Sequence, residues 1–343
     1  MFMVSVRRLL RREEMVLILT KSDMELVLTM KENIGVLEQA FKEQASGNVD
    51  MPLRPTIVLD EFHGRASFMP AYVGGDMKAL GIKVISAFQD NPTKHNLPFI
   101  QGTILLLDAK NGSLLAILDG GHVTAMRTAA ASGVATKYMA RQDAEQVGIF
   151  GAGIQGETHL LAMCEVRKIS KALVFDVSKQ KADAFSEKMK KVVGAEISVA
   201  NSEREVIKDS DIIVTVTTSR QPVFKGEWLE SGCHINGVGS HHGPGIREVD
   251  ETTVKRSLVV VDSKEACLKE AGDLIDPIAE GVISQDHIYA ELGEVVAGKK
   301  KGRMKDDDIT FFKSVGLALE DVSTALRTYD LAQKHGVGKN VAI

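Results

Sequence analysis

Cysteine is scarce in this sequence of 343 residues, which contains only Cys164, Cys233 and Cys267. Their odd number and wide spacing, with no Cys-x-x-Cys pair, argue against both a disulfide framework and a zinc site. The histidines form no His-Glu-x-x-His or similar ligand set, so we predict no metal site. These absences favour a reduced, cytoplasmic protein.

Long apolar runs and an excess of one charge are also missing. No run approaches the roughly 18 residues that a membrane-spanning helix needs, so we expect no membrane span. The net charge of −4 gives no electrostatic reason to expect a nucleic acid or an anionic membrane as a partner. The hydrophobic fraction of 44% is enough for the packed core of an ordinary globular protein.

The first 14 residues carry four arginines around Leu9 and Leu10. An export signal needs an apolar segment after its positive charges, whereas residues 11–14 are all charged. We therefore expect either a disordered leader or a native start at Met15.

The strongest functional pattern lies in residues 146–176. An apolar run at 146–150, long enough for a buried strand, is followed by a Gly-x-Gly-x-x-Gly turn. An amphipathic segment at 157–167 and a second strand-like run at 172–175 come next. This order is typical of a dinucleotide-binding βαβ unit. A βαβ unit without a nucleotide is the less favoured alternative, because the turn has every neighbour that the motif requires.

The glycines of this turn are Gly151, Gly153 and Gly156. In the motif they provide a tight turn, a close approach of the backbone to a pyrophosphate, and close packing of helix on strand. The helix that follows offers unpaired N–H groups and a positive dipole end to the phosphates. We therefore predict that Ile154 and Gln155, inside the turn, also contact the cofactor.

Asp176 lies twenty residues after Gly156, where an acid can accept hydrogen bonds from both hydroxyls of a ribose. A carboxylate at this place repels a 2′-phosphate, so NAD is favoured over NADP as the cofactor. Lys179 is close enough to weaken that preference.

The length of the chain predicts two domains. In the first part, short β-like runs at residues 56–59, 67–73 and 81–88 precede a hairpin around Asn111-Gly112. The strands of this hairpin are residues 100–107 and 114–118. Before these runs we predict a strand at 17–20 and helical structure from Ser22 and Asp23, as N-cap residues, to about Gln44 with a break near Thr29. Together they predict an antiparallel α+β domain.

The second part alternates strands with helices, which implies a parallel, doubly wound sheet. The predicted strands after the glycine turn are residues 172–175, 197–200, 211–217, 234–239 and 258–262. Ligands of such sheets bind beyond the carboxyl ends of the strands. This rule places Thr217, Thr218, Ser219, Val238 and Gly239 beside the cofactor.

Three cations of the first part attract attention, namely Arg54, Lys83 and Arg127. Arg54 and Lys83 lie in β-like runs, and Arg127 lies near the start of a helix predicted over residues 120–140, where backbone N–H groups favour anions. A buried lysine needs a partner or a function, because removing an ammonium group from water is costly. Taken singly, each is more often a surface or salt-bridged cation, and their spacing does not show that they converge.

Seven segments resemble the ornithine cyclodeaminase and mu-crystallin family, which also includes archaeal alanine dehydrogenases and several imine reductases. The resemblance extends from about residue 17 to residue 329. The segments are Ser67-Phe-Met-Pro-Ala-Tyr72, Gly81-Ile-Lys-Val-Ile-Ser86, Thr124-Ala-Met-Arg-Thr-Ala-Ala130, Gly151-Ala-Gly-Ile-Gln-Gly156, Asp211-Ile-Ile-Val-Thr-Val-Thr217, His234-Ile-Asn-Gly-Val-Gly239 and Phe312-Lys-Ser-Val-Gly-Leu-Ala-Leu-Glu-Asp321.

The resemblance implies that Arg54, Lys83 and Arg127 surround the carboxylate of a substrate below the nicotinamide ring. Arginine suits a carboxylate because it binds both oxygens at once. A lysine crowded by other cations has a lowered pKa and can exchange protons. The resemblance also assigns Met69 to the substrate site and Ser314 to the cofactor site. It further implies a homodimer formed through the first domain, onto which the closing helix folds back.

One segment departs from the family pattern. Members typically carry Gly-x-Asp-x-Pro-Gly after the strand that matches residues 234–239, and its aspartate activates water or the substrate amine. Here residues 239–245 read Gly-Ser-His-His-Gly-Pro-Gly, one residue longer and without the acid. His241 or His242 can take over acid–base work, since imidazole titrates near pH 6.5. The alternative is that both are loop residues that face solvent or that one binds a ribose.

We therefore predict an α/β protein with a Rossmann NAD-binding domain at residues 136–316. An α+β domain for substrate binding and dimerisation, at 15–135, is completed by the C-terminal helix within 317–343. The predicted function is an NAD-dependent, alanine dehydrogenase-like reaction on the α-carbon of a small amino or imino acid, with Lys83 and His241 as catalytic residues. Alternatives are cyclodeamination of ornithine to proline, reduction of pyrroline-2-carboxylate, and ligand binding without turnover.

Overall fold

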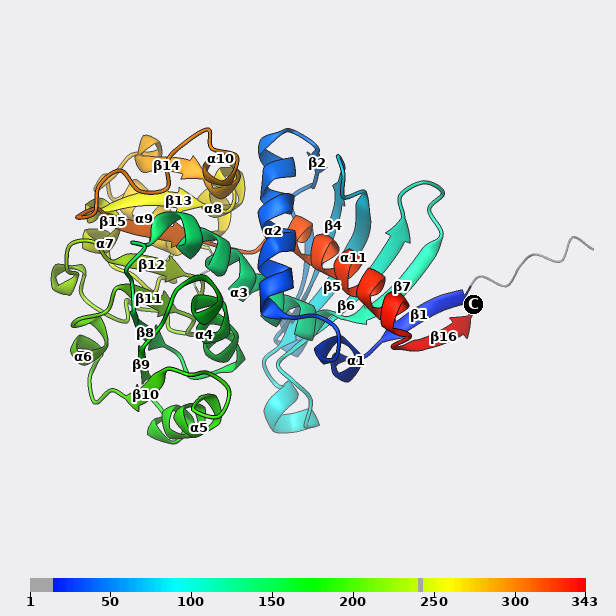
Figure 1. Cartoon of the computed structure of the whole chain (residues 1–343), viewed down its shortest axis with the longest axis horizontal. Helices are drawn as coiled ribbons and strands as arrows, with labels where there is room; N and C mark the ends of the chain where they lie inside the picture. Colours follow the sequence, from blue (N-terminus) through cyan, green and yellow to red (C-terminus); the bar gives the residue numbers. More distant parts are fainter. Residues whose placement is uncertain (1–14, 240–242) are drawn as a thin grey trace, which may run out of the picture.

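The computed structural model describes residues 15–239 and 243–343, and it contains two eight-stranded sheets in two lobes (Figure 1). One lobe holds strands β8–β15, and the other holds the first and last strands of the chain. Helix α2 lies between the two sheets, next to α3 and α11 (Figure 1). The predicted leader and His241 lie outside the described residues. None of the described helices is both long and apolar enough to span a membrane.

The sheet of the first lobe is antiparallel except where β1 pairs with β7. Its order is β16-β1-β7-β6-β5-β4-β2, with β3 paired to β4. The strands are β1 (Met15–Leu19), β2 (Val49–Asp50), β3 (Thr56–Leu59), β4 (Gly64–Val73), β5 (Ala79–Phe88), β6 (Ile100–Asp108), β7 (Leu114–Asp119) and β16 (Lys339–Ala342). The predicted antiparallel α+β character is therefore confirmed.

Two helices precede most of these strands, α1 (Lys21–Glu25) and α2 (Met30–Ala45). The expected break near Thr29 is present, because the Thr29 hydroxyl caps α2 by accepting from the Glu32 amide. The predicted N-cap at Ser22 or Asp23 is wrong. Thr20 caps α1, and the carboxylate of Asp23 accepts a hydrogen bond from the Thr20 amide, which completes a capping box.

The sheet of the second lobe is parallel throughout, in the order β10-β9-β8-β11-β12-β15-β13-β14. The direction of winding reverses between β8 and β11, which is where doubly wound sheets bind their ligands. The strands are β8 (Gln146–Phe150), β9 (Lys171–Phe175), β10 (Glu196–Val199), β11 (Ile212–Thr215), β12 (His234–Gly237), β13 (Ser257–Val261), β14 (Ile288–Glu291) and β15 (Ile309–Lys313). Both β11 and β12 end earlier than predicted, because the chain turns away from the sheet after Thr215 and Gly237.

Helices cover this sheet and connect its strands. They are α4 (Ile154–Val166), α5 (Lys179–Met189), α6 (Glu203–Ile207), α7 (Glu251–Arg256), α8 (Lys264–Glu270), α9 (Gly272–Ala279) and α10 (Leu292–Val296). Strand β15 enters the sheet between β12 and β13 although it comes later in the chain. The chain then leaves β15 for α11, so this strand leads directly from the second lobe back to the first.

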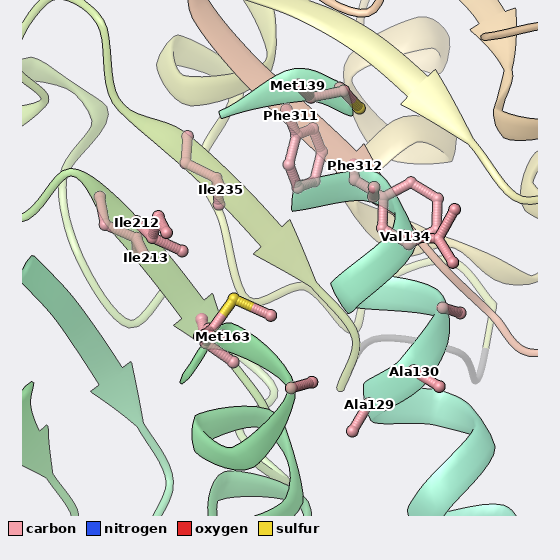
Figure 2. Close-up of a cluster of buried hydrophobic side chains, with 14 of the residues drawn as sticks. Ala129, Ala130, Val134, Met139, Met163, Ile212, Ile213, Ile235, Phe311 and Phe312 are labelled. Carbon is pink, nitrogen blue, oxygen red and sulfur yellow. The ribbon is translucent and has the colours of Figure 1, made fainter. Parts of the chain in front are cut away.

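Helix α3 (Gly120–Met139) joins the two lobes and is buried along most of its length. Its small residues, such as Ala129 and Ala130, allow close approach, and the helix packs on α2, α4 and α11. Figure 2 shows Val134 and Met139 of α3 in one cluster of buried side chains with Phe311 and Phe312 of β15. Because one core runs through this helix, the domain boundary predicted at residue 136 stays a prediction.

Helix α11 (Ala318–His335) packs on α2, α3 and strands β4, β5 and β6. It ends at Gly336, whose φ of 65° is the left-handed conformation that favours glycine at a helix end. Helices α3 and α11 thus place their side chains against the strand β5 that carries Lys83.

Candidate active site

The glycine turn after β8 has the backbone that a dinucleotide requires. Gly151 has a φ of 106°, and a Cβ there would lie 2.7 Å from the carbonyl oxygen of Val216. A Cβ at Gly156 would overlap the carbonyl oxygen of Gly151, so only glycine lets α4 pack this closely. Beside Gly153, by contrast, a Cβ would meet no atom within 4 Å. Open space therefore lies next to the middle of the turn.

The first turn of α4 faces this space with its backbone amides. Gly153 is the N-cap and provides no side-chain acceptor. Ile154, which follows it, is 53% exposed, and Gln155 comes next on the helix. Uncapped amides at the positive end of a helix suit a pyrophosphate.

Asp176 follows β9 and is tied to the glycine turn. Its carboxylate accepts hydrogen bonds from the amides of Ala152, at 3.0 Å, and Ser178, at 2.8 Å. The side chain that we predicted to bind a ribose therefore lies beside the turn. The residues present here fit a dinucleotide.

The other residues predicted to contact the cofactor gather at the same edge of the sheet. Thr217, Thr218 and Ser219 follow β11, Val238 and Gly239 follow β12, and Ser314 follows β15. The Ser314 hydroxyl donates to a carboxylate oxygen of Asp262 at 3.0 Å. Since β8, β11, β12 and β15 are adjacent and parallel, their carboxyl ends bring these residues to one place.

Lys83 lies in β5 with no exposed surface. Its ammonium group forms an ion pair with Asp321 of α11 at 2.6 Å and lies 3.3 Å from the hydroxyl of Thr124. Burial lowers the pKa of Lys83 to about 8; Asp321 opposes this shift, and the nearby charge of Arg127 adds to it. The ammonium group can therefore lose and regain a proton near neutral pH.

Arg127 meets Lys83 at the same carboxylate. Its Nε donates to the second oxygen of Asp321 at 3.0 Å, and its Nη1 donates to Glu320 at 2.7 Å. The prediction that Arg127 lies near a helix start, where backbone amides bind anions, is wrong. It is the eighth residue of α3, in the third turn, where every amide already serves the helix.

Arg54 lies in the loop before β3 rather than in a strand, which corrects the predicted β-like run. It makes a two-point ion pair with Glu270 of α8, at 2.8 Å and 3.1 Å. Its Nη2 also donates to the carbonyl groups of Val315 and Gly316. Met69 of β4, which is 3% exposed, lies with its sulfur 3.9 Å from Nη1 of Arg54.

The segment from β15 into α11 connects all three cations. Arg54 binds its backbone at Val315 and Gly316, and Lys83 and Arg127 both bind Asp321. A small cavity of about 50 Å³ lies at this junction, bordered by Met69, Arg54, Gly316 and residues of α8. The structure thus brings together the cations that sequence spacing left apart.

The acidic partners of these cations, Glu270, Glu320 and Asp321, were not predicted from the sequence. Glu270 lies outside every quoted motif. Glu320 and Asp321 end the last motif, but no spacing rule pairs them with cations some 200 residues away. Burial raises the pKa of Glu320 to about 7, although the charge of Arg127 opposes this shift. The available signal was the need of a buried lysine for a counter-charge.

A larger cleft of about 290 Å³ also borders Arg54 and Glu270. It is lined by Thr56, Ser67 and Ser86 of the first lobe and by Gly243 and Lys269 of the second. The Gly243 amide donates to the carbonyl oxygen of Glu270, so the described end of the loop that contains His241 lies beside this cleft.

Residues 13–336 match the model of the ornithine cyclodeaminase/mu-crystallin family. The chain belongs to this family. The resemblance predicted from seven short segments is therefore confirmed over nearly the whole chain.

Individual members of the ornithine cyclodeaminase/mu-crystallin family cover almost the same length. A Δ1-pyrroline-2-carboxylate reductase of Bacillus thuringiensis subsp. konkukian (strain 97-27) is 37% identical, with 95% of this chain and 99% of the relative covered. The structure of Thermococcus litoralis Δ1-pyrroline-2-carboxylate reductase with NADH and L-proline is 50% identical. It has a TM-score of 0.91 and covers 95% of this chain and 100% of that one. An archaeal alanine dehydrogenase dimer with bound NAD is 35% identical, with a TM-score of 0.89 and coverage of 96% and 99%.

In the described ranges, 15–239 and 243–343, no three metal-binding side chains come together. The three cysteines are free. Independence from metals and a cytoplasmic location stay predictions.

The shared carboxylate predicts a strong dependence of stability on Asp321. Asp321→Asn removes the charge that neutralises two buried cations, and breaking a buried ion pair from one side costs about 3–5 kcal/mol. Urea unfolding followed by circular dichroism will measure the loss. Asp143→Asn is the matched control, because Asp143 pairs with Arg141 at the surface with its own side chain 79% exposed, and it should leave the unfolding midpoint nearly unchanged. Equal midpoints for Asp321→Asn and the unmodified protein would contradict this account of the site.

Proposed function

We propose that this protein reduces a cyclic imino acid, Δ1-pyrroline-2-carboxylate, to proline with NADH. At the coarser level, it is an NAD-dependent oxidoreductase of the ornithine cyclodeaminase/mu-crystallin family. The observation that carries the finer proposal is the buried Lys83, which shares the carboxylate of Asp321 with Arg127. The likeness to a reductase solved with NADH and L-proline supports it.

The chemistry of the loop after β12 favours imine reduction. Reduction of the ring C=N bond adds one hydride to carbon and one proton to nitrogen, and it consumes no water. Oxidation of alanine to pyruvate also requires a group that activates water for hydrolysis of the imine. Residues 239–245 contain no carboxylate for that task, whereas Lys83 can deliver a proton.

Each residue then has a role that follows from its contacts. NADH, when bound, supplies the hydride. Among the described residues, Nη2 of Arg127 makes no hydrogen bond, so it can donate to the substrate carboxylate while Nε and Nη1 stay bound to the acids. Arg54 provides a second site for this carboxylate, with Met69 as the apolar wall beside it. His241 remains a candidate to relay protons between Lys83 and solvent.

The residues of the glycine turn would hold the dinucleotide. The α4 amides after Gly153 would bind the pyrophosphate and Asp176 a ribose, while Thr217, Ser219, Gly239 and the other residues at the strand ends would border the nicotinamide half. The carboxylate of Asp176 disfavours a 2′-phosphate, so the protein should prefer NADH to NADPH.

Alanine dehydrogenation is the second candidate, because an archaeal alanine dehydrogenase is 35% identical over nearly the full chain. Assays of NADH oxidation with different substrates distinguish the two reactions. We expect fast NADH oxidation with Δ1-pyrroline-2-carboxylate, slower oxidation with NADPH, and little with pyruvate plus ammonia, followed at 340 nm in a set of parallel assays. Turnover of pyruvate and ammonia with none of the cyclic imine would refute the reductase proposal and favour the alternative.

Lys83 should control the chemical step and its pH dependence. Replacing it by methionine keeps a long unbranched side chain but removes the amine that donates the proton. The kcat should therefore fall by roughly 10² to 10⁴. In the unmodified protein kcat for reduction should fall as the pH rises through about 8, because the protonated amine is the reactive form. Lys83→Met should lose this step of the pH profile and still bind NADH. Full turnover by Lys83→Met would remove Lys83 from the mechanism.

We also propose a homodimer formed through the first lobe. Ile57 and Val58 of β3 are 54% and 63% exposed, and Phe62, Leu97, Phe99 and Ile100 are also exposed. Val58 and Phe99 border one surface hollow, and Phe62 and Leu97 border another. Apolar side chains gathered in this way are typical of a surface that a partner covers. A structural relative that is 35% identical is a dimer.

The surface of β3 can be tested without touching the site. Val58→Asp places a charge among the apolar residues and should shift the protein toward monomers in sedimentation velocity. Val192→Asp is the control, because Val192 is 56% exposed on the second lobe. This variant should leave the sedimenting mass of the protein unchanged. If Val58→Asp sediments like the unmodified protein, β3 does not form the interface.

A further inference from the structure

A buried carboxylate joins two of the turns at the carboxyl edge of the parallel sheet. Glu248 has no exposed surface. One of its oxygens accepts hydrogen bonds from both the amide and the hydroxyl of Thr217, each at 2.6 Å. The other oxygen accepts from the amide of Gly239 at 2.6 Å. A single side chain therefore satisfies donors from the turn after β11 and from the turn after β12.

The two turns are in direct contact at this point. A Cβ on Gly239 would overlap the carbonyl oxygen of Thr217 and would lie 2.6 Å from the carboxyl carbon of Glu248. The turn after β11 continues from Thr217 to Ser219, whose amide donates to the Thr217 hydroxyl at 3.1 Å. The hydrogen bonds of Glu248 to both turns therefore fix how the turns lie against each other.

Glu248 is itself held by hydrogen bonds from its backbone to α9. Asp273 of α9 accepts hydrogen bonds from the amides of Glu248, at 2.7 Å, and Val249, at 3.1 Å, with one oxygen. Its other oxygen pairs with the ammonium group of Lys313 at 2.9 Å, and neither side chain is exposed. Lys313 is the last residue of β15, so the strand, α9 and both turns form one connected array.

Packing alone does not require such an array. Burying two carboxylates and an ammonium group is costly, and apolar side chains of similar size would fill the same volume. What the charges add is fixed geometry, because a carboxylate offers only acceptors and all three of its partners are donors. The result is a sheet edge whose shape is set before any ligand arrives.

We propose that Glu248 is a positioning residue for the cofactor. It holds the turns of Thr217 and Gly239 in the arrangement that binds the nicotinamide half of NADH. This inference rests on the proposed function, because it assigns these two turns to the cofactor. A preformed edge binds more tightly than one that must become ordered on binding. Loss of Glu248 should therefore weaken NADH binding even where no atom of Glu248 touches the cofactor.

The decisive variant is Glu248→Gln, which keeps the size of the side chain but turns one acceptor into an amide that faces another N–H group. We expect the Kd for NADH, measured by fluorescence titration, to rise roughly 10- to 100-fold, the range for hydrogen bonds to a charged group. The KM for NADH should rise in parallel, while the KM for the imino acid stays within about threefold. Glu248→Asp, which keeps the charge but is one methylene shorter, should give an intermediate Kd.

Asp250→Asn is the matched control from the same segment. Asp250 also accepts three hydrogen bonds at 2.7–2.9 Å, from the amide of Gly226 and from the amide and hydroxyl of Thr253, and none of them involves a cofactor-facing turn. The melting temperature of this variant, measured in the absence of NADH, should fall, while its Kd for NADH stays unchanged.

The outcomes separate the inference from the proposed function. If the unmodified protein binds NADH and Glu248→Gln binds it equally well, the positioning role is refuted and the proposed function stands. If Glu248→Gln and Asp250→Asn lose affinity to the same extent, Glu248 acts only through stability and the inference also fails. No NADH binding by the unmodified protein would overturn both.

Discussion

The carboxylate of Asp321, shared by Lys83 and Arg127, is the interaction on which the arrangement of the site depends. It joins β5, α3 and α11, three elements that are far apart in the sequence. Neither cation tolerates burial without a counter-charge, and one acid on α11 serves both. The closing helix therefore completes the site as well as the core. A chain that ended before α11 would leave two buried cations without their partner.

The same sharing gives the site its chemistry. A lysine with an acid of its own would keep a high pKa and would hold its proton. Here burial lowers the pKa of Lys83 to about 8, and the nearby guanidinium of Arg127 competes for the same acid. Glu320, whose pKa burial raises to about 7, adds a second group that can change charge when an anionic substrate enters. In the proposed reaction, binding of the substrate carboxylate and transfer of the proton would thus involve the same few side chains.

The sequence was most informative for features that depend on residues close together in the chain. The glycine turn and the parallel strands follow from patterns of a few residues, and the structure contains both. No strand was predicted at β15, although Ile309-Thr-Phe-Phe312 is rich in residues that favour strands. Its position between β12 and β13, by contrast, is a property of the whole sheet that its own residues do not indicate. The partners of the three cations were missed for a similar reason. Acids such as Glu270 and Asp321 become recognisable only when folding brings them within a few ångströms of a cation.

A common device at the edge of the parallel sheet is a carboxylate that binds backbone amides. Asp176 does so for the glycine turn, Glu248 for the turns after β11 and β12, and Asp262 for the amides of Val315 and Gly316. Each of these acids lowers the positive electrostatic potential of the loop whose amides it binds, so an anionic ligand binds less favourably to those amides. A pyrophosphate is left with the uncapped amides of α4, and a substrate carboxylate with Arg54 and Arg127, in the part of the chain that the structure describes. The two anionic groups that the proposed reaction requires would therefore bind at separate places, the pyrophosphate at the start of α4 after β8 and the carboxylate near the start of α11 after β15.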